Sequence, residues 1–209
     1  MAGDSVRNSE ATDTDTARRA LLTMLERDQE VRDDLVRRGT LFDSYDPRME
    51  EVHLEHATRL EAILRRHGWP DTDRFGEDGQ LASWTLLMHS ISRPDLMRYG
   101  RDLLAASAKA GSTPGHFLAR LEDRILTLEG QPQTYGTILD WDAEGVLGCL
   151  PIRDPASVDA RRAEVGLPPL AEHVTRRRQE ALAAGEGPPV DRHRKAREYE
   201  EWLRRAGWR

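Results

Sequence analysis

The chain contains few of the residues that build disulfides, membrane spans or secretion signals. Cys149 is the single cysteine among 209 residues, so no intrachain disulfide can form, and this usage fits a reducing compartment. No apolar run approaches the length of a membrane-spanning helix, and the polar start MAGDSVRNSEATDTDT lacks the apolar core of a signal peptide. These absences predict a cytoplasmic protein with no membrane partner and with a disordered segment over residues 1–15.

Lysine is scarce and several catalytic motifs are missing. Lys109 and Lys195 are the only lysines, so arginine supplies the other 29 of the 31 basic residues, and 37 acidic residues bring the net charge to −6. A net negative chain argues against a general nucleic-acid binder, whose surface is basic. No GxSxG elbow, Walker loop, dinucleotide fingerprint or HExxH motif occurs, which argues against ATP, nicotinamide and HExxH-type zinc chemistry. The sequence therefore favours a small-molecule substrate and no cofactor.

The sequence does contain a succession of amphipathic stretches separated by helix-terminating residues. Apolar side chains recur at spacings of three and four residues, and this pattern predicts a mainly α fold. We expect a single helical domain of about seven helices over residues 16–184, with a small β-hairpin near 137–152. A linker over 185–190 and a C-terminal helical appendage over 191–209 follow. The individual helices are expected at about 15–38, 46–67, 80–91, 94–110, 114–129, 155–165, 170–182 and 191–209.

The predicted helix over 46–67 places three histidines in its apolar stripe. Asp46 before Pro47 is typical of an N-cap followed by a proline at the first helical position, and Gly68, at a left-handed cap position, ends the helix. The stripe follows alternate spacings of four and three residues through Met49, His53, His56, Leu60, Ile63 and His67. We expect this helix to hold its imidazoles in fixed positions.

A carboxylate interrupts the apolar stripe of the first predicted helix. Asp28 takes a slot between Met24 and Val31, and Arg32 lies one turn further on. Because a buried carboxylate needs a partner, two interpretations stay open. Asp28 pairs either with Arg32 inside its own helix or with a histidine of the second helix.

Five short motifs occur in a fixed order along the chain. They are HGWP at 67–70, the segment from Trp84 to His89, LEDRI at 121–125, GQPQTYGT at 130–137 and PIRDPASVDARRAEVGLPPL at 151–170. In these motifs the chain resembles a bacterial family of small, mostly helical proteins of unknown function, marked by HGWP and by a PQxYGTQ loop before a short hairpin. The resemblance covers about residues 18–175 and implies a shared fold and a shared pocket. Two positions depart from it, since relatives carry asparagine in place of His56 and glutamine in place of Ile138.

Residue types that suit acid–base chemistry are predicted to meet in one pocket. Imidazoles exchange protons near neutral pH, a carboxylate can orient an imidazole, and arginine can hold an anionic substrate. The predicted catalytic residues are His67, His89, Asp123 and Tyr135, and the predicted substrate-binding residues are Arg124, His53, His56 and Trp69. This set suits metal-independent hydrolysis, elimination or isomerisation of a polar or anionic molecule. The plainer interpretation is that the histidines are hydrogen-bonded core residues and that the aspartate and tyrosine tie down a loop.

Two further functions stay open at the level of the sequence. Glu50, His53 and His56 have spacings that occur in metal-binding helices, although the second copy of the motif that a di-iron bundle needs is missing. Alternatively, the aromatic C-terminal helix over 191–209 could dock to a protein partner or to a second copy of the chain. Cys149 lies in a predicted strand, where a thiol is expected to be an inert apolar residue.

Overall fold

The computed structural model of the chain describes residues 2–39 and 45–209, with side chains from residue 10 onward. Over these residues the fold is mainly α, with eight α-helices, one short 3-10 helix and a two-stranded antiparallel sheet, which confirms the predicted fold class. Among the helices of this described part, none has the length and apolar character needed to span a membrane.

The described chain separates into two compact units at the junction of Thr113 and Pro114. The first unit comprises residues 2–39 and 45–113, and the second comprises residues 114–209. The sequence predicted one helical domain with a C-terminal appendage, whereas the last helix belongs to the second unit. The connection across the junction, residues 110–114, is as short as connections inside a single domain, so its length gives no sign of a boundary.

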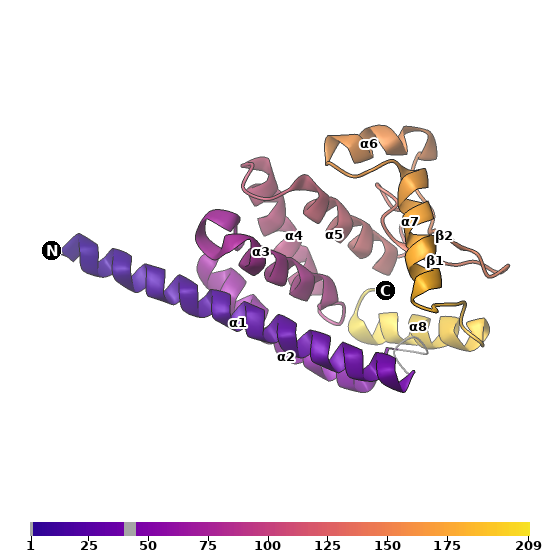
Figure 1. Ribbon diagram of the computed structural model, residues 1–209, viewed down its shortest axis with the longest axis horizontal. Helices are drawn as coiled ribbons and strands as arrows, with labels where there is room; N and C mark the ends of the chain where they lie inside the picture. Colours follow the sequence, from indigo (N-terminus) through magenta and orange to yellow (C-terminus); the bar gives the residue numbers. More distant parts are fainter. Residues whose placement is uncertain (1, 40–44) are drawn as a thin grey trace. The chain divides into compact units, whose positions relative to one another are not determined.

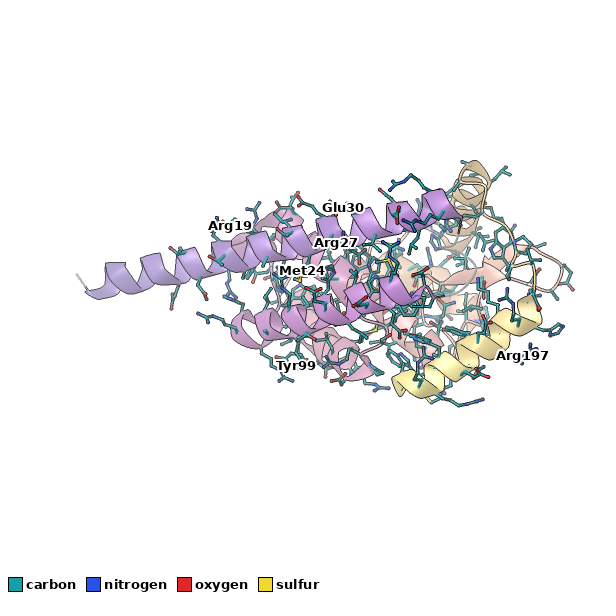
Figure 2. The ribbon with its side chains drawn as sticks, turned by 90° about the horizontal axis from the view of Figure 1, so that it is seen from below. Arg19, Met24, Arg27, Glu30, Tyr99 and Arg197 are labelled. Atoms are coloured by element: carbon teal, nitrogen blue, oxygen red, sulfur yellow. The ribbon has the colours of Figure 1, made fainter. Side chains whose placement is uncertain are left out.

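Four helices form the first unit. They are α1 (Ala2–Arg38), α2 (Pro47–His67), α3 (Thr72–His89) and α4 (Pro94–Lys109). Figure 1 shows α1 running alongside α2 and α3, and these three helices pack against one another. The apolar stripe of α1 is buried as predicted, with its carboxylate included: Ala17, Leu21, Met24, Asp28, Val31 and Leu35. Figure 2 locates the buried Met24 on the same helix as the exposed Arg19, Arg27 and Glu30.

The start of α1 differs from the prediction. The helix begins at Ala2, whereas the predicted helix starts at about residue 15 and follows a segment expected to be disordered. The hydroxyl of Thr16 donates to the carbonyl of Thr12, four residues earlier. The Thr16 hydroxyl therefore bonds within a continuous helix instead of capping a new one.

The boundaries of α2 are those predicted from its sequence. The Asp46 carboxylate accepts a hydrogen bond from the backbone N–H of Arg48 at 2.8 Å, and Pro47 is the first helical residue. At the other end, the N–H of Gly68 donates to the carbonyl of Leu64. Gly68 has a φ of +70°, which favours glycine, but its ψ of −158° lies outside the left-handed helical region of the predicted cap.

Helix α3 starts earlier than predicted because the turn-rich segment before residue 80 is itself helical. The Asp71 carboxylate caps a first turn by accepting from the N–H of Arg74 at 3.0 Å. Gly76, with a φ of +71°, then kinks the chain, and the helix continues to His89. Residues 72–79 lie outside the helix predicted at about 80–91, whereas they form its first turns, and Gly76 allows the two helical segments to join at a positive φ.

Helices α3 and α4 approach closely at Gly100. A Cβ atom at this position would lie 2.5 Å from Cδ2 of Leu87, which is fully buried. The absence of a side chain on Gly100 therefore permits the packing of the two helices.

The second unit combines four helices with a small hairpin. Its elements are α5 (Gly115–Leu128), β1 (Leu139–Trp141), β2 (Leu147–Cys149), η1 (Pro155–Ser157), α6 (Val158–Glu164), α7 (Leu170–Ala183) and α8 (Arg192–Ala206). The two strands pair antiparallel, with Leu139 opposite Cys149, which confirms the hairpin predicted near 137–152. Asp154, the expected N-cap of the next helix, has a φ of +46° and makes no capping hydrogen bond, so a 3-10 turn precedes α6.

The glycine-rich loop of the second unit is held by buried polar side chains. Gln133 is fully buried, and its amide nitrogen donates to the carbonyls of Ile138 and Leu150. Arg162 is also fully buried and donates to the carbonyl of Tyr135 at 2.6 Å. These bonds fix the loop between α5 and β1 from within the unit.

Most of the apolar surface of α8 is buried. Trp202 and Trp208 are each 5% exposed and Leu203 is fully buried, while Tyr199 is 45% exposed. The Arg209 guanidinium donates to the carbonyl of Leu128 at the end of α5. Of the aromatic residues that the docking hypothesis requires, Tyr199 alone is therefore substantially exposed.

Candidate functional site

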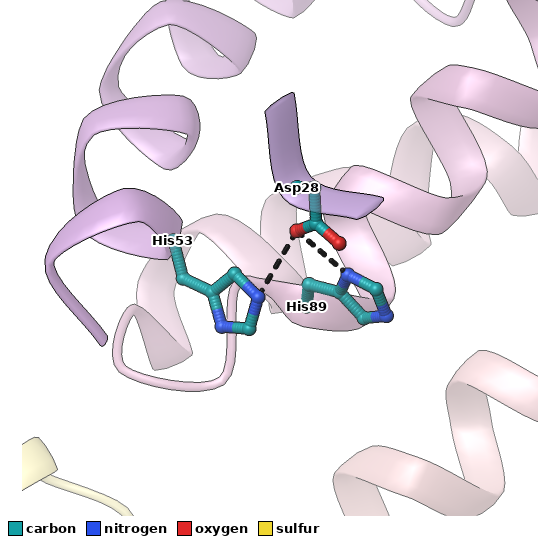
Figure 3. Close-up of side chains that lie close together, drawn as sticks. All are labelled: Asp28, His53 and His89. Carbon is teal, nitrogen blue, oxygen red and sulfur yellow. Dashed lines mark hydrogen bonds and ion pairs between the residues drawn. The ribbon is translucent and has the colours of Figure 1, made fainter. Parts of the chain in front are cut away.

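Three side chains from three helices of the first unit meet around one carboxylate oxygen. Asp28 Oδ2 of α1 lies 3.0 Å from Nδ1 of His89 at the end of α3 and 3.0 Å from Nε2 of His53 in α2 (Figure 3). We call these three residues the Asp28 cluster. Of the two partners considered for Asp28, the structure shows the histidine of the second helix, and it adds a histidine of α3.

The two histidine contacts differ in geometry. The contact of His89 Nδ1 with Asp28 is an aligned hydrogen bond, and the contact of His53 Nε2 with the same oxygen is an ion-pair contact. The imidazole rings lie close together, with centroids 5.0 Å apart and planes inclined by 32°. The second carboxylate oxygen, Asp28 Oδ1, is buried and has no hydrogen-bond partner within the described chain.

Tyr45 holds the far side of the His53 ring. Its hydroxyl lies 2.7 Å from His53 Nδ1, and the two rings stack with centroids 5.7 Å apart. This bond occupies Nδ1 and leaves Nε2 as the ring nitrogen that faces Asp28. A hydrogen bond to one ring nitrogen fixes the orientation and tautomer of an imidazole, so Tyr45 positions His53 within the cluster.

The cluster becomes more exposed from Asp28 to His89. The Asp28 side chain is 1% exposed, that of His53 is 9% exposed and that of His89 is 34% exposed. Burial alone would raise the pKa of the Asp28 carboxyl, but the contacts with His53 and His89 outweigh it and hold this pKa well below its usual range. The buried member of the cluster is therefore an ionised carboxylate, and His89 links it to the surface.

A pocket between α1 and α3 opens at His89. It has a volume of about 320 Å³, at the small end of ligand pockets. Its walls are polar and carry both signs of charge: Leu25, Asp28, Gln29, Arg32, Asp33, Thr85 and His89. Arg32, the other partner considered for Asp28, thus lies in the wall of the same pocket, where its guanidinium could hold an anion.

Another pocket, of about 510 Å³, lies between α1 and the start of α3. It is lined by Ala11, Thr14, Asp15, Arg18, Arg74, Phe75 and Gly76. Arg18 in this wall is paired with Asp78 through a hydrogen bond of 3.0 Å from Nε to Oδ1. Arg74, the second arginine of this wall, donates to the carbonyl of His67 at 2.8 Å. Because the larger pocket has no imidazole and both of its arginines are engaged, the smaller pocket is the better candidate for chemistry.

His67 does not join the cluster, which corrects the prediction that it works together with His89. It follows His53 by fourteen residues on α2, which is about 21 Å along a helix. Its Nε2 lies 3.5 Å from Oδ2 of Asp13, its ring meets Phe75 edge-on, and burial lowers its pKa. Histidines on one face of a helix share a direction, but they meet the same neighbours only within about one turn.

His56 and Trp69 are core residues in this structure. His56 is 4% exposed, and burial lowers the pKa of its imidazole. Trp69 is 5% exposed, and its indole N–H is buried without a hydrogen-bond partner in the described chain. The predicted metal alternative paired His53 with His56, whereas His53 faces Asp28 and His89. The carboxylate of Glu50 instead accepts a hydrogen bond from the Ser92 hydroxyl.

Asp123, Arg124 and Tyr135 belong to the second unit, where Asp123 anchors the glycine-rich loop. The Asp123 side chain is fully buried and accepts from the backbone N–H groups of Thr134, Tyr135 and Thr137 and from the hydroxyl of Thr137, at 2.7–3.0 Å. Tyr135 is half-buried, which raises its pKa, and Nε of Arg124 is buried. These contacts match the plainer interpretation, in which Asp123 ties down a loop.

Comparison with known proteins identifies one family. Residues 15–183 match a family described as "Family of unknown function (DUF6624)", which confirms the resemblance to a family of unknown function. Comparison with curated proteins and with solved structures gave no match.

Proposed function

The chain belongs to this family of unknown function, and we propose that it is an enzyme with its chemical centre at Asp28, His53 and His89. The substrate class is a small polar or anionic molecule bound in the pocket between α1 and α3. The proposal includes a cytoplasmic location in a bacterium, which the single cysteine and the sequence motifs support.

The observation that carries the proposal is a buried carboxylate oxygen with two imidazole nitrogens at 3.0 Å, one of them on a residue that lines a pocket. Removing a carboxylate from water costs several kcal/mol, and a leucine in the slot of Asp28 would pack the helices without that cost. Side chains with strong mutual electrostatic contacts beside a cavity are typical of functional sites.

His89 is the residue best placed for proton transfer. Its Nδ1–H donates to Asp28, so its Nε2 is the ring nitrogen left for a substrate. Asp28 orients the ring, as a carboxylate does for a catalytic imidazole. Arg32 supplies a positive charge in the same pocket for an anionic group. This assignment keeps His89 and His53 from the sequence analysis and replaces Asp123 by Asp28 as the orienting carboxylate.

The experiment is a screen of the purified protein against panels of small esters, phosphoesters, lactones and hydroxy acids. Asp28→Asn and His89→Gln should lower any turnover by at least about 100-fold, which is the usual contribution of a positioned acid or base. His193→Gln, an exposed histidine of α8, is the matched control and should leave turnover unchanged. Circular dichroism of each variant checks the fold. An activity that survives both cluster substitutions would place the chemistry elsewhere.

A further inference from the structure

We propose that Asp28, His53 and His89 bind one divalent first-row transition-metal ion. The inference rests on the proposed function, because it names a cofactor for the same site and replaces the metal-independent chemistry expected from the sequence. When the ion is bound, Nδ1 of His89 is a ligand and carries no proton, so metal-assisted chemistry takes the place of the proton transfer described for His89. It assigns Oδ of Asp28, Nε2 of His53 and Nδ1 of His89 as the three protein ligands.

The spacing of the donor atoms fits an ion. One ligand atom from each of the three residues lies within 4.8 Å of the others, and Asp28 Oδ2 is 3.0 Å from each imidazole nitrogen. Ligands about 2.1 Å from a metal ion and at right angles around it are about 3.0 Å apart. The separations of Asp28 Oδ2 from the two imidazole nitrogens therefore match neighbouring positions on a coordination sphere, and a small rotation of the side chains would bring the third separation into range.

Hydrogen bonding within the protein accounts for only part of the cluster. It accounts for the aligned contact of His89 with Asp28. It does not account for the buried Oδ1 of Asp28, which has no hydrogen-bond partner in the described residues. A buried polar atom without a partner is costly, and an ion between the carboxylate and the two rings would engage these groups together.

Tyr45 supplies the outer contact that metal-binding histidines usually have. Its hydroxyl is 2.7 Å from Nδ1 of His53. A ligand histidine typically donates its second N–H to an oxygen, which orients the ring and directs the other nitrogen to the ion. In this arrangement Nε2 of His53 presents its lone pair towards Asp28 and His89.

The pocket provides the open side of the site. Asp28 and His89 both line it, so coordination positions that the protein does not fill would face a volume of about 320 Å³. Two imidazoles and one carboxylate, with no sulfur ligand, suit Zn²⁺, Fe²⁺, Co²⁺ or Mn²⁺. A bound ion of this kind supplies a Lewis acid and an activated water at neutral pH, while Arg32 would attract an anionic substrate to the same pocket.

The test measures metal binding directly. The full-length protein is stripped with a chelator, loaded separately with Zn²⁺ and Co²⁺, and analysed by elemental analysis and by the visible absorption of bound Co²⁺. We expect about one ion per chain for the wild type and for the control variant His67→Gln, whose imidazole lies outside the cluster. Asp28→Asn and His89→Gln should weaken binding by more than about 100-fold, and Tyr45→Phe by about 10-fold to 100-fold, as outer-contact substitutions do.

Protein folding is checked in parallel by thermal unfolding with and without the metal. Binding to the folded state should raise the unfolding temperature of the wild type but not of Asp28→Asn or His89→Gln. His89 is the most exposed member of the cluster, so its variant keeps the test valid if Asp28→Asn fails to fold. The inference is overturned if the wild type binds neither ion, or if Asp28→Asn and His89→Gln bind the ions as tightly as the wild type does.

The outcomes separate the metal inference from the proposed function. If the metal-free protein turns over a substrate and Asp28→Asn abolishes that activity, the metal inference fails and the proposed enzyme remains. If metal binds as expected and a measured turnover is unaffected by its loss and by both substitutions, the metal site stands and the proposed function fails.

Discussion

Replacing Asp123 by alanine tests whether this carboxylate holds the glycine-rich loop or serves chemistry. The substitution removes the acceptor of four hydrogen bonds: three from backbone N–H groups of residues 134–137 and one from the Thr137 hydroxyl. The site is fully buried, so water does not replace the lost acceptor without rearrangement of the loop.

The expected loss is large. A hydrogen bond to a charged group contributes about 1.5–3 kcal/mol, and contributions within one group are not additive. Even with non-additivity we expect the free energy of unfolding to fall by about 4 kcal/mol or more. That loss is a major part of the roughly 5–15 kcal/mol that stabilises a typical protein. Asp123→Asn keeps one carbonyl oxygen but turns an N–H₂ group towards hydrogen-bond donors. Its free energy of unfolding should therefore lie between those of the wild type and Asp123→Ala.

Urea denaturation followed by circular dichroism measures these values, with Asp102→Ala as the control. Asp102 is an exposed acid whose side chain pairs with its neighbour Arg101, and its loss should change the free energy of unfolding by less than about 1 kcal/mol. If Asp123→Ala also loses less than about 1 kcal/mol, the loop does not depend on this carboxylate and the structural assignment is wrong.

Three other predictions concern packing, backbone conformation and pH. Gly100→Ala should lower the free energy of unfolding by about 1–2 kcal/mol in urea titrations, because its methyl group would meet Leu87 and the strain exceeds the gain in helix propensity. In a Leu87→Ala background the same change should be neutral or stabilising, and an equal loss in both backgrounds would contradict the packing explanation. Gly136→Ala should lower the free energy of unfolding by about 1–3 kcal/mol in the same assay, because Gly136 has a φ of +66° and a Cβ would lie 2.6 Å from Ile152. Its control is Gly148→Ala, which has open space around the added methyl group and should lower the free energy of unfolding much less. Burial lowers the folded-state pKa of His173 below the usual value of about 6.5, so the unfolded chain binds more protons and the free energy of unfolding should decrease as the pH falls below about 6.5. Urea denaturation at pH 7.5, 6.5 and 5.5 should show this decrease, and the free energy of unfolding of His173→Gln should change less with pH than that of the wild type. The same dependence on pH in both proteins would contradict the prediction.

Local signals were enough to predict α2. An aspartate followed by proline at one end and a glycine at the other set its boundaries, and each of these signals acts within a few residues. The burial of the α1 stripe followed for the same reason, since it depends only on helical periodicity. The kink at Gly76 was missed because the same residues suit a loop, and neighbouring helices decide which conformation is adopted.

The candidate site could be predicted only in part. Asp28 was recognised as a carboxylate in an apolar slot, but its partner His89 is 61 residues away in the sequence, and no local pattern joins the two. His67 was grouped with His53 because the two share a helical face, and periodicity does not report distance along the axis. Tyr45 precedes its helix and carried no signal that linked it to His53.

The placement of the junction at Thr113 and Pro114 has a consequence for how such a chain can evolve. Every donor atom of the Asp28 cluster is encoded before residue 114, in three helices that pack on one another. Residues after that point contribute no donor atom to the cluster, so insertions or substitutions among them would leave all three of the groups proposed for chemistry in the chain.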